Sequence, residues 1–175
     1  MSLDYWANYA DIVAIPIGVV GVILIVRQLI LTRLESEKEH QRRQNEMTLN
    51  AYNAVRGDLR ETIRRIRHKL SFDDMFDEFT DASLKQIIED NELRDDVARM
   101  LGFLNKFAVG IKYDVFNIEL LNDLSGTLFI ETFKQFRPYI DLVRKDSKDF
   151  YIEYERVVER LKCMKHKKGL EACPF

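Results

Sequence analysis

Apolar side chains form one long run near the N-terminus and several helical stripes after it. The run covers residues 12–31 (IVAIPIGVVGVILIVRQLIL), and only Arg27 and Gln28 interrupt it. Twenty residues at a helical rise of about 1.5 Å cover the roughly 30 Å hydrocarbon core of a bilayer. The run therefore predicts a single N-terminal transmembrane helix, contained within residues 1–33.

The charges that flank this run predict its orientation. Asp4 and Asp11 precede it, and no Lys or Arg does. The basic residues that accompany or closely follow it are Arg27, Arg33, Lys38, Arg42 and Arg43. Because Lys and Arg are enriched on the cytoplasmic side of a membrane, we expect the N-terminus outside and the remaining chain in the cytoplasm.

The stretch after the run has no apolar face. Residues 35–46 (ESEKEHQRRQNE) contain no apolar side chain, which is typical of a helix that crosses solvent. We therefore expect a helical stalk over residues 34–50. In a ring of subunits, the stalk would line a hydrated vestibule or pore with Gln41, Gln44 and Asn45. Small residues let helix backbones approach closely in lipid, so the expected packing face in the membrane consists of Ala14, Gly18 and Gly21.

Helical periodicity governs the rest of the chain. Apolar residues recur at intervals of three or four through 52–70, 93–107 and 154–161, as on one face of an amphipathic helix. Beside the first stripe, arginines form a basic companion face at Arg56, Arg60, Arg64 and Arg67. Ser125-Gly126 predicts a turn, and Pro138 predicts a kink within a helix.

These patterns predict an all-α fold, since no hairpin or βαβ pattern occurs. About five helices would make up a cytoplasmic bundle after the anchor. The expected organisation is a transmembrane anchor (1–33), a polar helical stalk (34–50), a cytoplasmic helical bundle (51–170) and a tail (171–175).

Charge is distributed unevenly along the chain. Residues 27–70 carry a net +5, residues 71–155 a net −9, and residues 156–169 a net +5. One interpretation is a basic surface for anionic lipid or RNA. The other, which the composition favours, is that the basic helix ends pair with the acidic middle of the same or a neighbouring subunit.

Candidate chemistry is sparse. Cys163, His166 and Cys173 provide at most three metal ligands without a CxxC pair, so we expect no metal and no cofactor. The pair worth weighing for catalysis is Arg160 and His166, because His can transfer a proton in phosphodiester cleavage and Arg can hold the phosphate. The alternative is structural: Arg160 pairs with Glu153 or Glu159, and His166 interacts with a helix C-terminus.

An N-terminal membrane helix, a small all-α domain and a single Arg-x5-His near the C-terminus resemble the membrane accessory protein of type VI-B CRISPR loci. The stretch LGFLNKFAVGIKYDVFNIELLNDLSG and the later FKQFRPYIDLVRKD also resemble a broader bacterial membrane-anchored domain of unknown function. The first resemblance implies a divergent HEPN-like helical domain, with Arg160 and His166 at the family's motif positions. Active HEPN ribonucleases usually place a polar residue after the arginine, where this chain has Leu161.

The resemblance implies a non-enzymatic function. We expect a homo-oligomer of six or more chains that forms a pore in the bacterial inner membrane and supports antiphage defence. Its partners would be the lipid bilayer and, through a functional link, an RNA-guided RNA-targeting nuclease. Two alternatives stay open: a membrane-tethered HEPN-type ribonuclease, and a membrane anchor that recruits a cytoplasmic partner.

Overall fold

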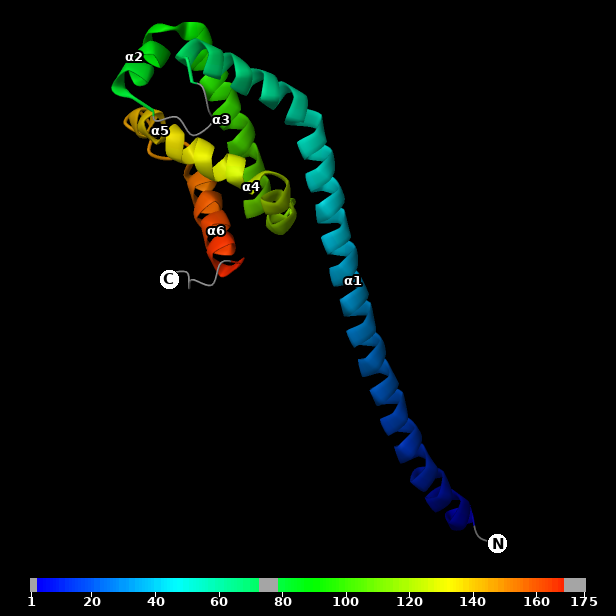
Figure 1. The fold of residues 1–175 in the computed structure, drawn as a ribbon. Coiled ribbons are helices and arrows are strands. Elements are labelled where there is room, and N and C mark those ends of the chain that lie inside the picture. The colour runs from blue at the N-terminus through cyan, green and yellow to red at the C-terminus, as the bar shows by residue number, and fades with distance from the viewer. Residues whose placement is uncertain (1–2, 73–78, 169–175) are drawn as a thin grey trace. The chain divides into compact units, whose positions relative to one another are not determined.

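The computed structural model describes the backbone of residues 3–72 and 79–168, and the side chains of residues 21–72 and 79–166. Six helices make up this part of the chain (Figure 1): α1 (Leu3–Leu70), α2 (Asp81–Glu89), α3 (Asn91–Lys112), α4 (Ile118–Gln135), α5 (Arg137–Val143) and α6 (Ile152–Lys168). No strand occurs in these ranges. The all-α class predicted from the sequence is confirmed.

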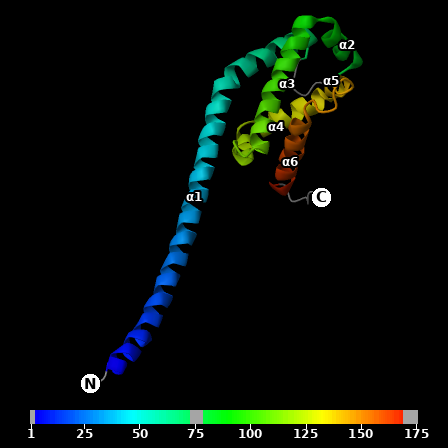
Figure 2. The same cartoon turned by 180° about the vertical axis from the view of Figure 1, so that it is seen from behind.

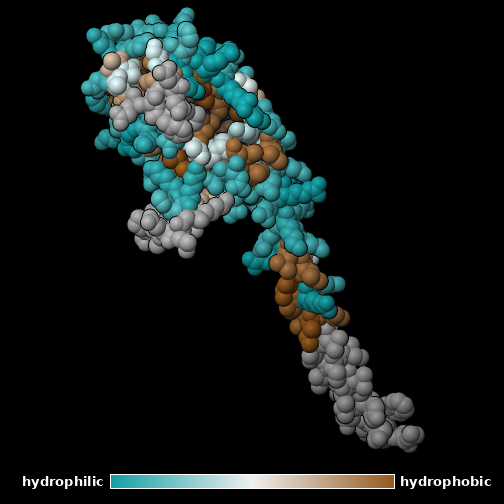
Figure 3. All heavy atoms as spheres, viewed as in Figure 1, coloured by the Kyte–Doolittle hydropathy of each residue, from teal (hydrophilic) through white to brown (hydrophobic). Residues whose placement is uncertain are grey.

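Contacts divide the chain into two units, Met1–Arg43 and Gln44–Phe175, and α1 contributes residues to both. The first unit consists of the N-terminal part of α1. Its described apolar side chains are largely exposed, as Figure 3 shows in brown. They are Val22, Ile23, Leu24, Ile25, Val26, Leu29, Ile30, Leu31 and Leu34.

The transmembrane prediction needs correction. In the part of the chain with described side chains, no helix is long and apolar enough to cross a membrane. The apolar stretch there extends only from Gly21 to Leu31, about half of the roughly 20 residues that a span requires, and it contains Arg27 and Gln28. The other half of the predicted span, before Gly21, lies outside the described side chains.

The prediction of a single N-terminal transmembrane helix is therefore wrong, and so is the predicted location that depended on it. A single-pass inner-membrane protein, with its N-terminus outside and its C-terminal domain in the cytoplasm, requires such a helix. The prediction depended on the apolar character of one segment. In the structure that segment is part of α1, which extends to Leu70.

The core of the second unit forms where apolar side chains of all six helices meet. α3 packs on α6, and α6 packs on α4 (Figure 2). The predicted stripe of α3 is buried throughout, and α1 adds Leu59, Ile66 and Leu70 to the same core. Tyr154 of α6 is fully buried, and its hydroxyl donates a hydrogen bond of 2.7 Å to the carbonyl oxygen of Phe129 in α4.

Polar contacts fix the start of α4 against α1. Asn117 is the N-cap of α4, and its side-chain oxygen accepts hydrogen bonds from the N–H groups of Glu119 and Leu120. The backbone N–H of Asn117 donates to Thr48 Oγ1 at 2.9 Å. Since Thr48 is completely buried on α1, this contact holds the two helices in one position relative to each other.

Helix α4 contains a bend and ends before Pro138. Ser125 has non-helical backbone angles (φ −159°, ψ 19°) within α4, at the site of the predicted turn. The predicted kink at Pro138 is a helix boundary instead. Pro138 lies in the first turn of α5, where its missing N–H leaves no helical hydrogen bond unmade.

Candidate anion-binding site

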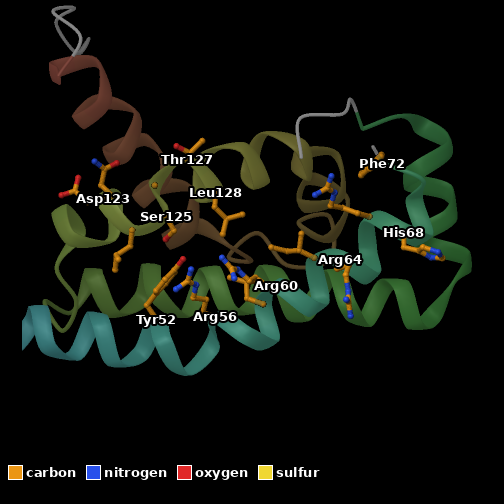
Figure 4. A pocket seen from close by; sticks show the side chains of 16 residues that line it. Tyr52, Arg56, Arg60, Arg64, His68, Phe72, Asp123, Ser125, Thr127 and Leu128 are labelled. Atoms are coloured by element: carbon orange, nitrogen blue, oxygen red, sulfur yellow. The ribbon is translucent and has the colours of Figure 1, made fainter. Parts of the chain in front are cut away.

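A cleft of about 710 Å³ lies in the second unit between α1 and the bend of α4 (Figure 4). One wall consists of α1 side chains and the other of residues around Ser125. The lining residues are Tyr52, Arg56, Leu59, Arg60, Ile63, Arg64, Arg67, His68, Phe72 and residues 122–128. This volume lies within the range of small-ligand pockets, roughly 300–1,000 Å³.

The α1 wall is basic because of helical spacing. Arg56, Arg60 and Arg64 recur every four residues, so they lie along one face of the helix. The adjacent Leu59 and Ile63 pack into the core and fix how α1 is rotated. The buried stripe thereby turns the arginine face toward the cleft.

Ion pairing differs among the arginines of α1. Arg65, which does not line the cleft, donates two hydrogen bonds of 2.8 and 2.9 Å to the carboxylate of Asp96 on α3. This hydrogen bonding from Arg65 lowers the pKa of Asp96. Arg64 contacts Glu61 at 3.2 Å in an exposed pair. Arg56 and Arg60 form no ion pair within the described part of the chain.

The α4 wall carries buried oxygens without hydrogen-bond partners. The side-chain oxygens Asn122 Oδ1 and Ser125 Oγ are both buried and unbonded in the structure. Such a group costs about 1–3 kcal/mol unless a partner satisfies it. Figure 4 shows Arg56 and Tyr52 on α1 opposite Ser125. Because both atoms are buried, a ligand in the cleft would reach them only after a change of side-chain rotamer.

Gly126 makes this wall possible. A Cβ atom added at Gly126 would lie 2.4 Å from Asn122 Oδ1, well inside contact distance. A larger residue here would displace the Asn122 amide from its present position.

Helix α6 adds positive charge at the edge of the cleft. Lys165 Nζ donates a hydrogen bond of 2.6 Å to Thr127 Oγ1, and Thr127 lines the cleft. The Ser125 bend therefore has basic side chains from both α1 and α6 near it. An anion in the cleft would experience the combined attraction of these groups.

A family model described as a domain of unknown function (DUF4760) matches residues 15–161. The chain belongs to the DUF4760 family. Both walls of the cleft fall inside the matched region of this DUF4760 domain. The chain matches no curated protein and no solved structure. The family match supports the resemblance to a domain of unknown function, and it shows no link to CRISPR loci or HEPN proteins.

The residues predicted for catalysis lie elsewhere in this DUF4760 domain. Arg160 and His166 are both on α6, and neither lines the cleft. A separation of six residues places them about 120° apart around the helix axis. The structure shows no ion pair of Arg160 with either glutamate: Glu153 contacts Lys112 and Arg156, and Glu159 contacts Lys162.

Two of the three predicted vestibule residues make contacts within the second unit. Gln44 Nε2 donates to the backbone oxygen and Oδ1 of Asp114, at 2.7 and 2.8 Å. Asn45 Oδ1 accepts a hydrogen bond of 2.8 Å from the Asn117 side chain. Gln41 is exposed. Their role as pore lining stays a prediction.

The other predicted residues are only partly described. Ala14 and Gly18 lie outside the described side chains, and a Cβ added at Gly21 would meet nothing within 4 Å. Cys163 is a half-buried free thiol, and Cys173 lies outside the described residues. Among the described residues, no group of three or more His, Cys, Asp or Glu side chains could hold a metal ion.

The sequence did not predict the cleft as a site, because a recognisable pattern exists for only one of its two walls. The four arginines on one face were apparent, but residues 122–128 are far from them in the chain. A useful signal was present. None of these arginines has an acidic residue four positions away with which to pair along the helix, and only Arg64 has one three positions away, at Glu61.

Proposed function

We propose that this DUF4760 domain binds a phosphate-bearing anionic ligand in the cleft between α1 and the α4 bend. The observation that carries the proposal is the position of Arg56 and Arg60. Both lack an ion pair within the described chain, and both line the cleft.

Guanidinium groups suit phosphate especially well. Arg presents several N–H donors in a planar fork and forms paired hydrogen bonds to phosphate oxygens. It also stays charged at any physiological pH. Two such groups on one helix face, with Lys165 near the opposite wall, favour an anionic ligand over a neutral one.

The composition of the cleft supports binding rather than catalysis. Its residues with the most useful proton-transfer chemistry are Asp123 and His68. Figure 4 shows them at opposite ends of the cleft, so they do not form an acid–base pair. We therefore propose a binding module.

Calorimetric titration of the full chain with inorganic tripolyphosphate tests this proposal. We expect saturable binding, and an Arg56→Gln, Arg60→Gln double variant should bind at least tenfold more weakly. Arg99→Gln is the matched control, because Arg99 is an exposed arginine of α3 outside the cleft. Equal loss in the control variant, or no binding by the unaltered chain, would refute the proposal.

The CRISPR resemblance suggested several functions. The inner-membrane pore depended on a spanning helix, so it is not part of our proposal. A ribonuclease that uses Arg160 and His166 stays a hypothesis. Its test is cleavage of a labelled RNA, which an Arg160→Ala, His166→Ala variant should abolish if that hypothesis is right. Self-association into a ring, and recruitment of a partner, likewise stay predictions.

A further inference from the structure

The basic wall of the cleft is linear. Arg56, Arg60 and Arg64 follow one another at four-residue intervals, and Arg67 continues the series. Four residues of helix rise about 6 Å, so the series from Arg56 to Arg67 extends for about 16 Å. A single phosphate group or a mononucleotide would occupy one end of this series and leave the other end unused.

A 6 Å interval is close to the distance between neighbouring phosphates in an extended nucleic-acid strand. A groove that follows the backbone with regularly spaced basic side chains is the usual arrangement in proteins that bind single strands. The spacing on α1 therefore favours a ligand with several phosphates in series.

Aromatic side chains lie near both ends of the series. Tyr52 precedes Arg56 by one helical turn, and Phe72 lies beyond His68. Both are only half-buried and both line the cleft, so part of each ring is open to a ligand. Base stacking on such rings contributes affinity without requiring a particular sequence.

The opposite wall provides groups that suit bases and sugars. The Asn122 amide and the Ser125 hydroxyl can hydrogen-bond base edges or ribose hydroxyls. Asn122 Oδ1 and Ser125 Oγ are buried and have no hydrogen-bond partner in the structure, so a change of rotamer would bring them to a base or sugar. A strand whose phosphates contact α1 would direct its bases or sugars toward this wall.

Cleft shape argues against a duplex. Proteins that recognise double-stranded DNA usually insert a protruding helix or ribbon into a groove about 12 Å wide. Here the arginines line a concave site, with α4 on the other side (Figure 4). With α4 on the other side, the cleft suits a single strand better than the wider duplex.

From these observations we infer that the cleft binds a single-stranded nucleic acid, with its phosphates on the α1 arginines and its bases toward Asn122 and Ser125. This inference rests on the proposed anion-binding function and names its ligand class. About three phosphates of the strand would contact the arginines, given the interval between Arg56 and Arg64.

Fluorescence anisotropy with a 5′-fluorescein-labelled decameric single-stranded RNA tests the inference. In competition, we expect the decamer to bind at least tenfold more tightly than tripolyphosphate. A duplex of the same sequence should bind more weakly than the single strand. The logarithm of the binding constant should fall with the logarithm of salt concentration with a slope of about −2, as for three phosphates on a single strand.

Variants test whether the decamer binds at these arginines. The Arg56→Gln, Arg60→Gln variant should lose at least tenfold in affinity for the decamer, Arg56→Lys, Arg60→Lys should recover part of it, and Arg99→Gln should change it less than twofold. Circular dichroism of each variant establishes that it is folded.

The outcomes separate the inference from the proposed function. If tripolyphosphate binds through Arg56 and Arg60 but the decamer binds no more tightly, the single-strand inference is wrong and the anion site stands. The inference is also wrong if the duplex, or vesicles of anionic phospholipid, bind through these arginines as tightly as the decamer. If neither tripolyphosphate nor the decamer binds, both fail.

Discussion

Gly126 and Asn122 share a space on α4 that only a residue without a side chain leaves open. A Cβ atom at position 126 would lie 2.4 Å from Asn122 Oδ1 and 3.2 Å from its Cγ. Because Asn122 lines the cleft, the geometry of the α4 bend and the position of the Asn122 side chain are coupled.

Gly126→Ala should therefore weaken ligand binding more than it weakens folding. The atom that must move is the end of a flexible side chain, so we expect the free energy of unfolding to change by no more than about 1 kcal/mol. Displacement of Asn122 should reduce affinity for tripolyphosphate or the RNA decamer severalfold. Urea denaturation and anisotropy measure the two effects. Unchanged affinity in a folded variant would contradict a role for Asn122.

Gly102→Ala is the matched glycine substitution, and it should stabilise the domain. Gly102 lies inside α3, and a Cβ there would meet nothing within 4 Å. Alanine in a helix interior is favoured over glycine by about 0.5–1 kcal/mol. The urea midpoint should rise while ligand affinity stays the same. A lower midpoint would mean that α3 is packed more tightly at this position than the structure shows.

Thr48→Val should destabilise the second unit by about 1–3 kcal/mol. The Thr48 hydroxyl accepts a hydrogen bond from the Asn117 N–H and donates one of 2.7 Å to the Gln44 carbonyl oxygen. Valine has a similar shape but removes the partner of the Asn117 N–H. The control is Thr62→Val, because the equally buried Thr62 hydroxyl receives only a 3.4 Å contact from Arg65. Equal losses in the two variants would contradict this prediction.

Acid should weaken the contact between α1 and α3. Hydrogen bonds from Arg65 lower the pKa of Asp96 in the folded protein, and those from Lys69 lower that of Asp90. Each contribution to stability is therefore complete above the ordinary carboxyl pKa, about 3.8, and is lost as pH falls through the lower folded-state pKa. Urea denaturation from pH 7 to pH 3 should show this fall. It should be smaller in Asp96→Asn, and a fall of the same size in that variant would contradict it.

Local sequence patterns predicted most of the helical core. The stripe on α3 is buried as expected, and so are Tyr154, Val157, Val158 and Leu161 on α6. Phe150, four residues before Tyr154, is 46% exposed, because it precedes α6 in a turn and does not follow helical spacing. Helical periodicity therefore predicts burial only for residues that lie within a helix.

Features that depend on tertiary contacts could not be predicted from the sequence. Pro138 is compatible with a kink or a helix start, and only the break at Phe136 decides between them. The arginine face of α1 was visible as a pattern, but its function as a cleft wall depends on the packing of residues 122–128 against it. The apolar run at 12–31 suggested a membrane span, but no helix with described side chains is long and apolar enough for one.

The most direct test of the proposed site is a nuclear magnetic resonance titration of the isotope-labelled full chain with tripolyphosphate. Binding in the cleft predicts the largest chemical-shift changes at the Asn122 side-chain amide and at the backbone amides of Ser125 and Gly126, with little change at Gly102 on α3. Changes confined to the region of Arg160 and His166, with the α4 bend unaffected, would contradict it.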